Sequence, residues 1–221
     1  MTEPNNIEDL SKLMEHILLA PQLSETEVGY GCELAKQYAI AAVIVRPSDL
    51  DLAINWLRDS PVALGTVIDL PNGHSTTAAK LFAARDALRR GAKEIDTVMN
   101  TGKLISRQFQ YLETELLQMA DACHAAGAIL KVTLESEHLN EELKIVACRI
   151  ARRAGADFLS TSTVEDIALL GKLQAIASVS TLDQALAFRD GGCKRLQSTQ
   201  TPAILEAWKA KLAETETEPR P

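Results

Sequence analysis

The regular alternation of short apolar runs with amphipathic stretches constrains the fold of this chain most strongly. Seven strand-like runs lie at 41–45, 62–68, 94–99, 128–134, 157–162, 173–177 and 194–199, and a shorter candidate at 17–19 precedes them. Strands that alternate with helices build a parallel sheet with right-handed crossovers. An open doubly wound sheet normally has a glycine-rich phosphate turn after its first strand, and this chain has none. Eight units therefore predict an α/β fold with a single closed (β/α)8 TIM barrel.

Helix start and stop signals divide the chain at the same places. Ser24 with Glu27 three residues later has the spacing of a capping box, and Ser75 and Asn140 each precede a long helical stretch. Glycines follow several of these stretches, as expected of helix C-termini. We expect the barrel to occupy residues 7–212. Residues 213–221 are rich in glutamate, threonine and proline, and they predict a disordered acidic tail, as do the first six residues.

Composition excludes several classes of function. The chain has 221 residues, 46% hydrophobic and 24% charged, with a net charge of −7, which is typical of a soluble globular domain. An acidic chain is a poor fit to nucleic acid, so no such partner is expected. The sequence has neither a signal-peptide pattern nor an apolar run long enough for a bilayer, and this predicts a cytoplasmic protein without a membrane partner.

Cysteines and histidines do not have the spacing of a metal site. The four cysteines are predicted to be reduced thiols that are mostly buried, and the four histidines are scattered. We therefore predict no metal. The cysteines and histidines considered are Cys32, Cys123, Cys148, Cys193, His16, His74, His124 and His138.

Polar residues occur inside several predicted strands, where an ordinary core would avoid them. If Asp96 points into the barrel, Glu94 and Asn100 share its face, and if Lys131 points inward, Glu135 does too. Buried charges are costly unless they are paired. Two interpretations remain open: a structural ion pair with solvated strand ends, or a site with perturbed charges.

Four segments give the chain a family resemblance that covers about Leu10 to Trp208. They are Glu15–Pro21 (EHILLAP), Glu94–Asn100 (EIDTVMN), Leu130–Glu135 (LKVTLE) and Ala147–Phe158 (ACRIARRAGADF). Together they resemble the deoxyribose-phosphate aldolase family. The resemblance implies a TIM barrel, no cofactor, a small aldehyde or sugar-phosphate ligand, and a homo-oligomer such as a dimer.

The resemblance also shows where this chain departs from the family. Ser160 stands at the position of the Schiff-base lysine, and Gln174 at that of a second lysine that tunes the first. The family has two glycines that approach a substrate phosphate, and this chain has Ala177 and Ser178 at those positions. Gln197 replaces a family glycine on the last strand. A hydroxyl group cannot form the imine on which this chemistry depends.

Other family positions are retained. Asp96, Asn100 and Lys131 match the family, in which the aspartate relays protons and the lysine supports it. Candidate ligand-binding residues at the strand ends are Asn100, Arg46, Glu135, Ser178 and Thr199. Arg46 has two possible roles: it can hold an anion, or it can form a salt bridge with Asp49.

Three functional hypotheses follow, and whether the protein is an enzyme stays open among them. The leading hypothesis is an aldolase-like barrel that has lost Schiff-base catalysis and is a non-catalytic or repurposed small-molecule-binding protein. The second is an active lyase on 2-deoxyribose 5-phosphate or a related aldehyde, with Lys131 as the amine and Asp96 as the proton relay. The third is a regulatory or assembly subunit of an active paralogue.

Overall fold

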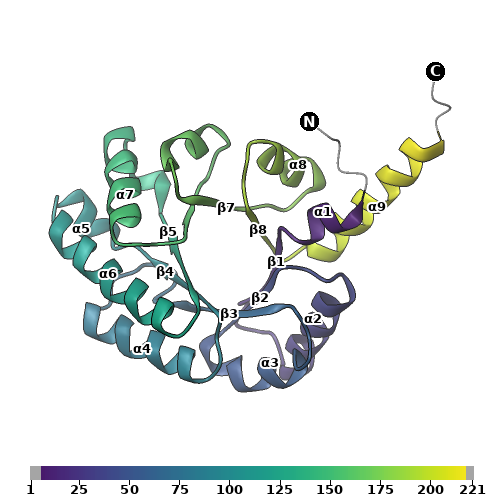
Figure 1. Cartoon of the computed structure of the whole chain (residues 1–221), viewed down its shortest axis with the longest axis horizontal. Coiled ribbons are helices and arrows are strands. Elements are labelled where there is room, and N and C mark those ends of the chain that lie inside the picture. The colour runs from purple at the N-terminus through teal and green to yellow at the C-terminus, as the bar shows by residue number, and fades with distance from the viewer. Residues whose placement is uncertain (1–5, 218–221) are drawn as a thin grey trace.

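The chain forms a closed barrel of eight parallel strands, in the order β1 to β8, surrounded by helices (Figure 1). The structure is a computed structural model that describes residues 6–217. The strands are β1 Met14–Leu18, β2 Ala42–Val45, β3 Ala63–Ile68, β4 Glu94–Val98, β5 Ile129–Thr133, β6 Phe158–Ser160, β7 Gln174–Ser178 and β8 Arg195–Ser198. The predicted TIM barrel is confirmed.

Helices follow the strands and cover the outside of the barrel. The α-helices are α1 Ile7–Ser11, α2 Glu25–Gln37, α3 Leu50–Trp56, α4 Thr77–Arg89, α5 Thr101–Ile105, α6 Phe109–Ala125, α7 Glu141–Arg153, α8 Leu182–Asp190 and α9 Thr201–Thr217. Short 3-10 helices are η1 Pro47–Asp49, η2 Ser136–His138 and η3 Glu165–Leu170.

Side-chain caps begin several of these helices. Ser24 and Glu27 form the predicted capping box of α2, and Asn140 accepts from the Leu143 amide at 2.9 Å to begin α7. The predicted cap at Ser75 is wrong by one residue, because Thr76 caps α4. Ser75 instead donates from both its amide and its hydroxyl to Asp69, each at 2.7 Å.

The apolar core has two parts. The larger part lies between the strands and the helices, where side chains such as Leu130 and Met119 are fully buried. A smaller apolar cluster fills the inside of the barrel beside β1, β2 and β3, and includes Ala42, Ile44 and Val67. The inward-facing positions of β4, β5 and β8 include Glu94, Asp96, Lys131, Arg195 and Gln197, so the barrel interior has an apolar side and a charged side.

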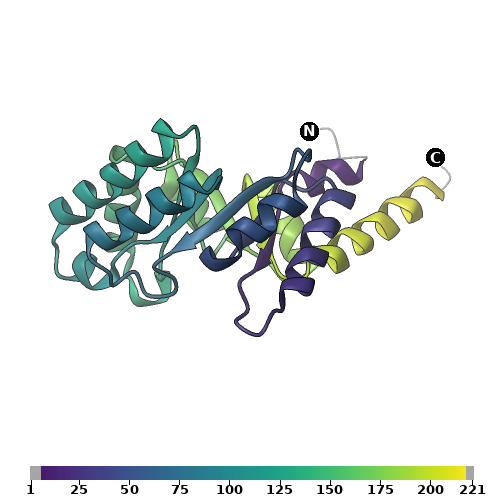
Figure 2. The same cartoon turned by 90° about the horizontal axis from the view of Figure 1, so that it is seen from below.

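The ends of the chain differ in part from the predicted disorder. Asn6 caps α1, which packs against α9, and residues 1–5 lie outside the described residues. Helix α9 continues to Thr217 and extends beyond the barrel (Figure 2). The first five residues of the predicted tail, 213–217, are therefore helical here, and 218–221 lie outside the described residues.

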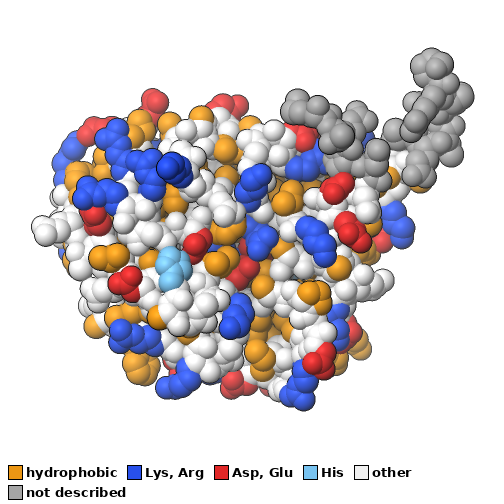
Figure 3. All heavy atoms as spheres, in the orientation of Figure 1, with side chains coloured by type: hydrophobic (Ala, Val, Ile, Leu, Met, Phe, Trp, Pro, Cys, Tyr) orange, Lys and Arg blue, Asp and Glu red, His pale blue; other side chains and the backbone are white. Residues whose placement is uncertain are grey.

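All four cysteines are free and buried, as predicted. Burial raises the pKa of Cys32 and Cys193 to about 11, so both remain neutral thiols near neutral pH. In the part of the chain that is described, no helix is long and apolar enough to cross a membrane. Acidic and basic side chains are intermixed over the face in Figure 3, without a continuous basic surface.

Candidate functional site

Lys131 is the centre of the charged side of the barrel interior. It lies on β5, where strand alternation turns its side chain inward, and it is completely buried. Its ammonium lies 2.8 Å from Oε2 of Glu15 on β1 and 2.9 Å from Oε2 of Glu94 on β4. Both carboxylates are also buried, so the lysine and its two partners are shielded from water.

Arg195 provides the second cation of this group. Its Nε lies 3.2 Å from Oε1 of Glu15 and its Nη2 lies 3.3 Å from Oε1 of Glu94. The guanidinium also lies over the ring of Phe158, 5.6 Å from its centroid, an arrangement that attracts cations. We call Glu15, Glu94, Lys131 and Arg195 the interior charge cluster. In this cluster each carboxylate contacts both cations.

Asp96 joins the cluster through hydrogen bonds. Thr133 donates its hydroxyl to Oδ1 of Asp96 at 2.9 Å. Gln197 donates from Nε2 to Oδ2 of Asp96 and to Oε2 of Glu15, each at 3.2 Å. The side chain of Gln197 therefore connects Asp96 with the interior charge cluster.

The electrostatics of this region follow from three carboxylates facing two cations. Burial raises the pKa of Glu15 and of Asp96, although the positive charge of Lys131 opposes both shifts. Burial also acts on Glu94, but Lys131 and Arg195 outweigh it and hold its pKa below the usual value. For Lys131 the burial effect is outweighed by Glu15 and Glu94, so its pKa is raised. The lysine is consequently a protonated ammonium near neutral pH.

Ser160 lies at the end of β6 and bonds to the backbone just after the neighbouring strand β5. Its Oγ accepts a hydrogen bond from the Leu134 amide at 2.8 Å, and the next serine, Ser162, shares a hydrogen bond with Ser136. A small cavity of about 10 Å³ lies beside Ser160 and Ser162, with Lys144 among its lining residues. Among the described hydrogen bonds, none joins Ser160 to the interior charge cluster.

The remaining predicted site residues lie apart from the cluster. Asn100 accepts from the Lys103 amide at 2.9 Å and caps α5, and Glu135 accepts from the Thr101 hydroxyl at 2.9 Å. Three further members of this set are exposed: Gln174, Ser178 and Thr199. Among the described residues, none of the three has a hydrogen bond to the interior charge cluster.

Arg46 adopts the second of its two predicted roles. Its Nε lies 2.6 Å from Oδ2 of Asp49. The guanidinium also donates to the carbonyls of Ala20 and Pro21 at 3.1 Å and of Leu23 at 2.9 Å. Arg46 therefore holds the loop between β1 and α2, with its donors directed at protein groups.

Sequence reasoning placed Asp96 and Lys131 in one interior, and the structure brings them together. It did not identify Arg195 as part of this interior. The signal that could have found it is the two-residue spacing of Arg195 and Gln197 on β8, which puts both on the same face. Glu15 has the matching signal on β1, as the polar residue that pairs in register with Gln197.

A second buried ion pair lies between the helices. Lys80 of α4 donates to Oε1 of Glu115 on α6 at 2.8 Å and to the Val98 carbonyl at 2.9 Å. Both side chains are almost completely buried. This pair fixes α4 to α6 and to the end of β4, outside the barrel interior. In the described residues, no group of three or more His, Cys, Asp or Glu is placed to hold a metal ion.

Comparison with known proteins agrees with this architecture. No protein-family model matches the chain. The deoxyribose-phosphate aldolase of Thermoanaerobacter pseudethanolicus is 35% identical over 216 residues, which is 90% of this chain and 97% of that protein. That of Treponema denticola is 35% identical over 212 residues, or 89% of this chain and 98% of that protein.

Solved structures give the same result. The aldolase QR15 is 28% identical with a TM-score of 0.87, covering 95% of this chain and 99% of the other. The closed eight-stranded barrel and this structural match define a TIM-barrel protein of the aldolase type. With relatives of 35% identity over nearly its whole length, the chain belongs to the deoxyribose-phosphate aldolase family.

Proposed function

We propose that this protein is a deoxyribose-phosphate aldolase-family barrel that no longer forms a Schiff base and has become a non-catalytic, small-molecule-binding protein. One observation carries the proposal. Lys131 is the only lysine within the eight described strands, and its ammonium is held between Glu15 and Glu94.

The chemistry of imine formation explains why this matters. An amine attacks a carbonyl only through the neutral lone pair, and lysines used in this way have a lowered pKa. The two carboxylates raise the pKa of Lys131 despite its burial, so they stabilise the ammonium form. An aldehyde would also have to displace two buried ion pairs to reach this amine. Both effects support the loss of Schiff-base catalysis.

The family positions on β6, β7 and β8 support the same conclusion. Ser160 and Gln174 replace the two lysines, and the Ser160 hydroxyl already accepts a backbone hydrogen bond. Gln197 replaces a glycine and extends into the interior, where it bonds to Asp96 and Glu15. The nucleophile, its tuning cation and part of the open interior are thus changed together.

The strand ends suggest a ligand without a phosphate group. After β6, β7 and β8 the polar side chains include the hydroxyls of Ser160, Ser178 and Thr199. The cation Arg46 is bonded to Asp49 and three carbonyls, and the cation beside Ser160, Lys144, is bonded to Asp166. Hydroxyl groups suit a neutral aldehyde or polyol, whereas phosphate recognition favours arginine, lysine or close backbone amides. We propose a neutral polar ligand near Ser160, Ser178 and Thr199. Buried free thiols suit the reducing cytoplasm, where we propose that the protein acts.

Borohydride trapping tests the loss of catalysis. The protein is incubated with 2-deoxyribose 5-phosphate or acetaldehyde, reduced with borohydride, and analysed by intact mass and peptide mapping. We expect no stoichiometric adduct from a protein shown to be folded by circular dichroism. A stoichiometric adduct on Lys131 would support the alternative of an active lyase and would overturn the proposal.

Ligand binding is tested separately by isothermal titration. The wild type is titrated with 2-deoxyribose and with 2-deoxyribose 5-phosphate, and the Ser178→Lys variant serves as a matched protein with a new cation. We expect the neutral sugar to bind the wild type at least as tightly as the phosphate, and the variant to gain affinity for the phosphate only. Tighter binding of the phosphate by the wild type would contradict a neutral ligand.

A further inference from the structure

A groove lies at the amino end of the barrel, between the end of α3 and the starts of β3 and β4. Most residues from Ile54 to Leu64 line it, together with Gly91 and Lys93. We call it the β3/β4 groove, and its volume is about 440 Å³. The ligand site proposed above lies at the carboxyl ends of the parallel strands, so the two sites are at opposite ends of the barrel.

The floor of the β3/β4 groove is apolar and belongs to the core. Leu57, Val62 and Leu64 are each no more than 6% exposed and pack within the main apolar cluster. Ile54 and Pro61 add apolar surface that is open to solvent. Small-molecule sites usually have about 300–1,000 Å³ of space and a mostly apolar lining with a few polar groups, and this groove matches that description.

Two cations line the groove, and in the described part of the chain none of its lining residues is acidic. Arg58 donates from Nη2 to Oδ1 of Asn55 at 2.8 Å, and its remaining N–H groups have no partner among the described residues. The backbone of Lys93 is fixed, because its amide donates to the Leu64 carbonyl at 2.8 Å and its carbonyl accepts from the Ile129 amide at 3.0 Å. The ammonium of Lys93 has no described hydrogen bond or ion pair. Two positive charges beside an apolar floor are therefore left without a carboxylate.

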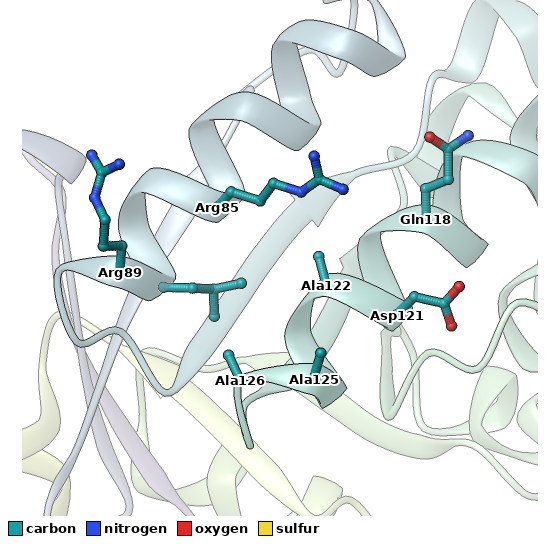
Figure 4. A pocket seen from close by; sticks show the side chains of 8 residues that line it. Arg85, Arg89, Gln118, Asp121, Ala122, Ala125 and Ala126 are labelled. Carbon is teal, nitrogen blue, oxygen red and sulfur yellow. The ribbon is translucent and has the colours of Figure 1, made fainter.

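A groove between α4 and α6 has a different charge pattern (Figure 4). It is larger, about 540 Å³, but Asp121 lines it as well as Arg85, and Arg89 is paired with Asp86. An anion in that groove would meet a carboxylate. The whole chain has a net charge of −7 and on balance repels anions, so a groove with two cations and no acid is a local exception.

We propose that the β3/β4 groove binds a small carboxylate with an apolar body. In this arrangement the guanidinium of Arg58 receives the carboxylate, Lys93 adds a second positive charge, and the apolar body covers Leu57 and Val62. The reactive end of a barrel of this type is the carboxyl end of its strands. We therefore expect the carboxylate to bind at the amino end without being transformed.

Titration of the full-length, 15N-labelled protein with hexanoate tests the proposal by NMR. We expect saturable shifts of backbone amides within residues 54–64 and 91–93, and none at Ser160 or Ser178. Acetate supplies the charged group alone and 1-hexanol supplies the apolar body alone. Each is expected to bind at least tenfold more weakly than hexanoate, because each lacks one of the two contacts.

Charge removal then tests the two cations. Arg58→Gln and Lys93→Gln are each expected to raise the dissociation constant of hexanoate at least threefold, and both residues are exposed, so the circular dichroism spectrum should not change. The matched control is Arg85→Gln, which removes an exposed arginine from the groove between α4 and α6 and should leave hexanoate binding unchanged.

Three results would overturn the proposal. The first is the absence of saturable hexanoate shifts in the β3/β4 groove, including shifts confined to the carboxyl ends of the strands. The second is binding of acetate or 1-hexanol as tight as that of hexanoate. The third is a dissociation constant that changes less than threefold in either Arg58→Gln or Lys93→Gln, or that rises as much in Arg85→Gln.

Discussion

The ammonium of Lys131 and the carboxylate of Glu15 are 2.8 Å apart, although 116 residues separate them in the sequence. Lys131 lies on β5 and Glu15 on β1, which are four strands apart in a closed barrel of eight. The ion pair therefore spans the barrel interior and connects its opposite walls. Both groups are completely buried, so neither can exchange its partner for water without opening the barrel.

Replacing Lys131 with methionine is expected to destabilise the barrel strongly. Methionine has a similar length but no charge, and it leaves Glu15 and Glu94 buried with Arg195 as their remaining cation. Breaking a buried ion pair on one side typically costs about 3–5 kcal/mol. We expect a loss of this size in the free energy of unfolding, measured by urea denaturation at pH 7.

The matched control for this change is Lys93→Met. Lys93 precedes β4 and is exposed, so the same substitution there removes a charge without leaving a buried carboxylate unpaired. Its effect should remain within about 0.5 kcal/mol. Equal effects of the two variants would show that the interior charge cluster has no special role in stability.

The charged interior could be predicted in part from the sequence, and the reason is geometric. Strand alternation alone predicted that Asp96 and Glu94 share an inward face, and that Lys131 does so on the neighbouring strand. It could not show that Glu15 also pairs with Lys131, because β1 and β5 face each other only across the closed barrel. Arg195 was missed for that reason, since only the closed barrel brings it to Glu15 and Glu94.

Local signals succeeded where the interaction is short in sequence. The capping box of Ser24 and Glu27 was predicted correctly because three residues fix its geometry. The cap of α4 was misplaced because Asp69, six residues earlier, takes both donors of Ser75. The extension of α9 to Thr217 was missed because the composition of its last turns carries no apolar stripe.

Placing a lysine at position 160 is expected to restore imine formation and to lower the stability of the fold. The Ser160→Lys side chain would extend from the end of β6 without the carboxylates that hold Lys131, so a neutral amine is more accessible there. The larger side chain also displaces the hydrogen bond to the Leu134 amide, and overpacking typically costs about 1–3 kcal/mol. We expect borohydride trapping with acetaldehyde to label this variant at position 160.

Gln174→Lys is the matched variant for that experiment. It introduces the same amine on β7, at a residue whose register partner is Phe158 rather than the end of β6. We expect no adduct from it alone. Labelling of Gln174→Lys, or none in Ser160→Lys, would contradict the assignment of position 160 as the site of imine formation.

Removing the Arg46 side chain is expected to loosen the loop between β1 and α2. In Arg46→Ala the carbonyls of Ala20, Pro21 and Leu23 lose their donor and Asp49 loses its cation. Losing the charge-assisted hydrogen bond to Asp49 and the bonds to the three carbonyls is expected to lower the free energy of unfolding by about 1–3 kcal/mol. Hydrogen exchange should rise within residues 20–24 and remain unchanged in α7. Unchanged exchange in the loop, with weaker binding of an anionic ligand, would instead support the phosphate-binding role.

The pH dependence of stability is expected to change when Asp96 is replaced by asparagine. Burial raises the pKa of Asp96 in the folded protein, and Lys131 only partly opposes this shift. The folded state therefore retains the proton to a higher pH than the unfolded chain, whose aspartates titrate near 3.8. The contribution of protonated Asp96 to the free energy of unfolding is therefore fully present below pH 3.8, and it is lost as the pH rises through the raised pKa of the folded state.

Asp96→Asn has no proton to lose at this position, so its stability should lack that decline. The difference in the free energy of unfolding, variant minus wild type, is expected to increase as the pH rises from about 4 and to level off above the folded pKa of Asp96. Glu15 titrates with the same sign in both proteins, so its contribution cancels in the difference to first order. Urea denaturation between pH 4 and 8 measures this curve. A difference that stays constant over the range would mean that Asp96 ionises alike in the folded and unfolded states, and that its burial beside Gln197 and Thr133 is fully compensated.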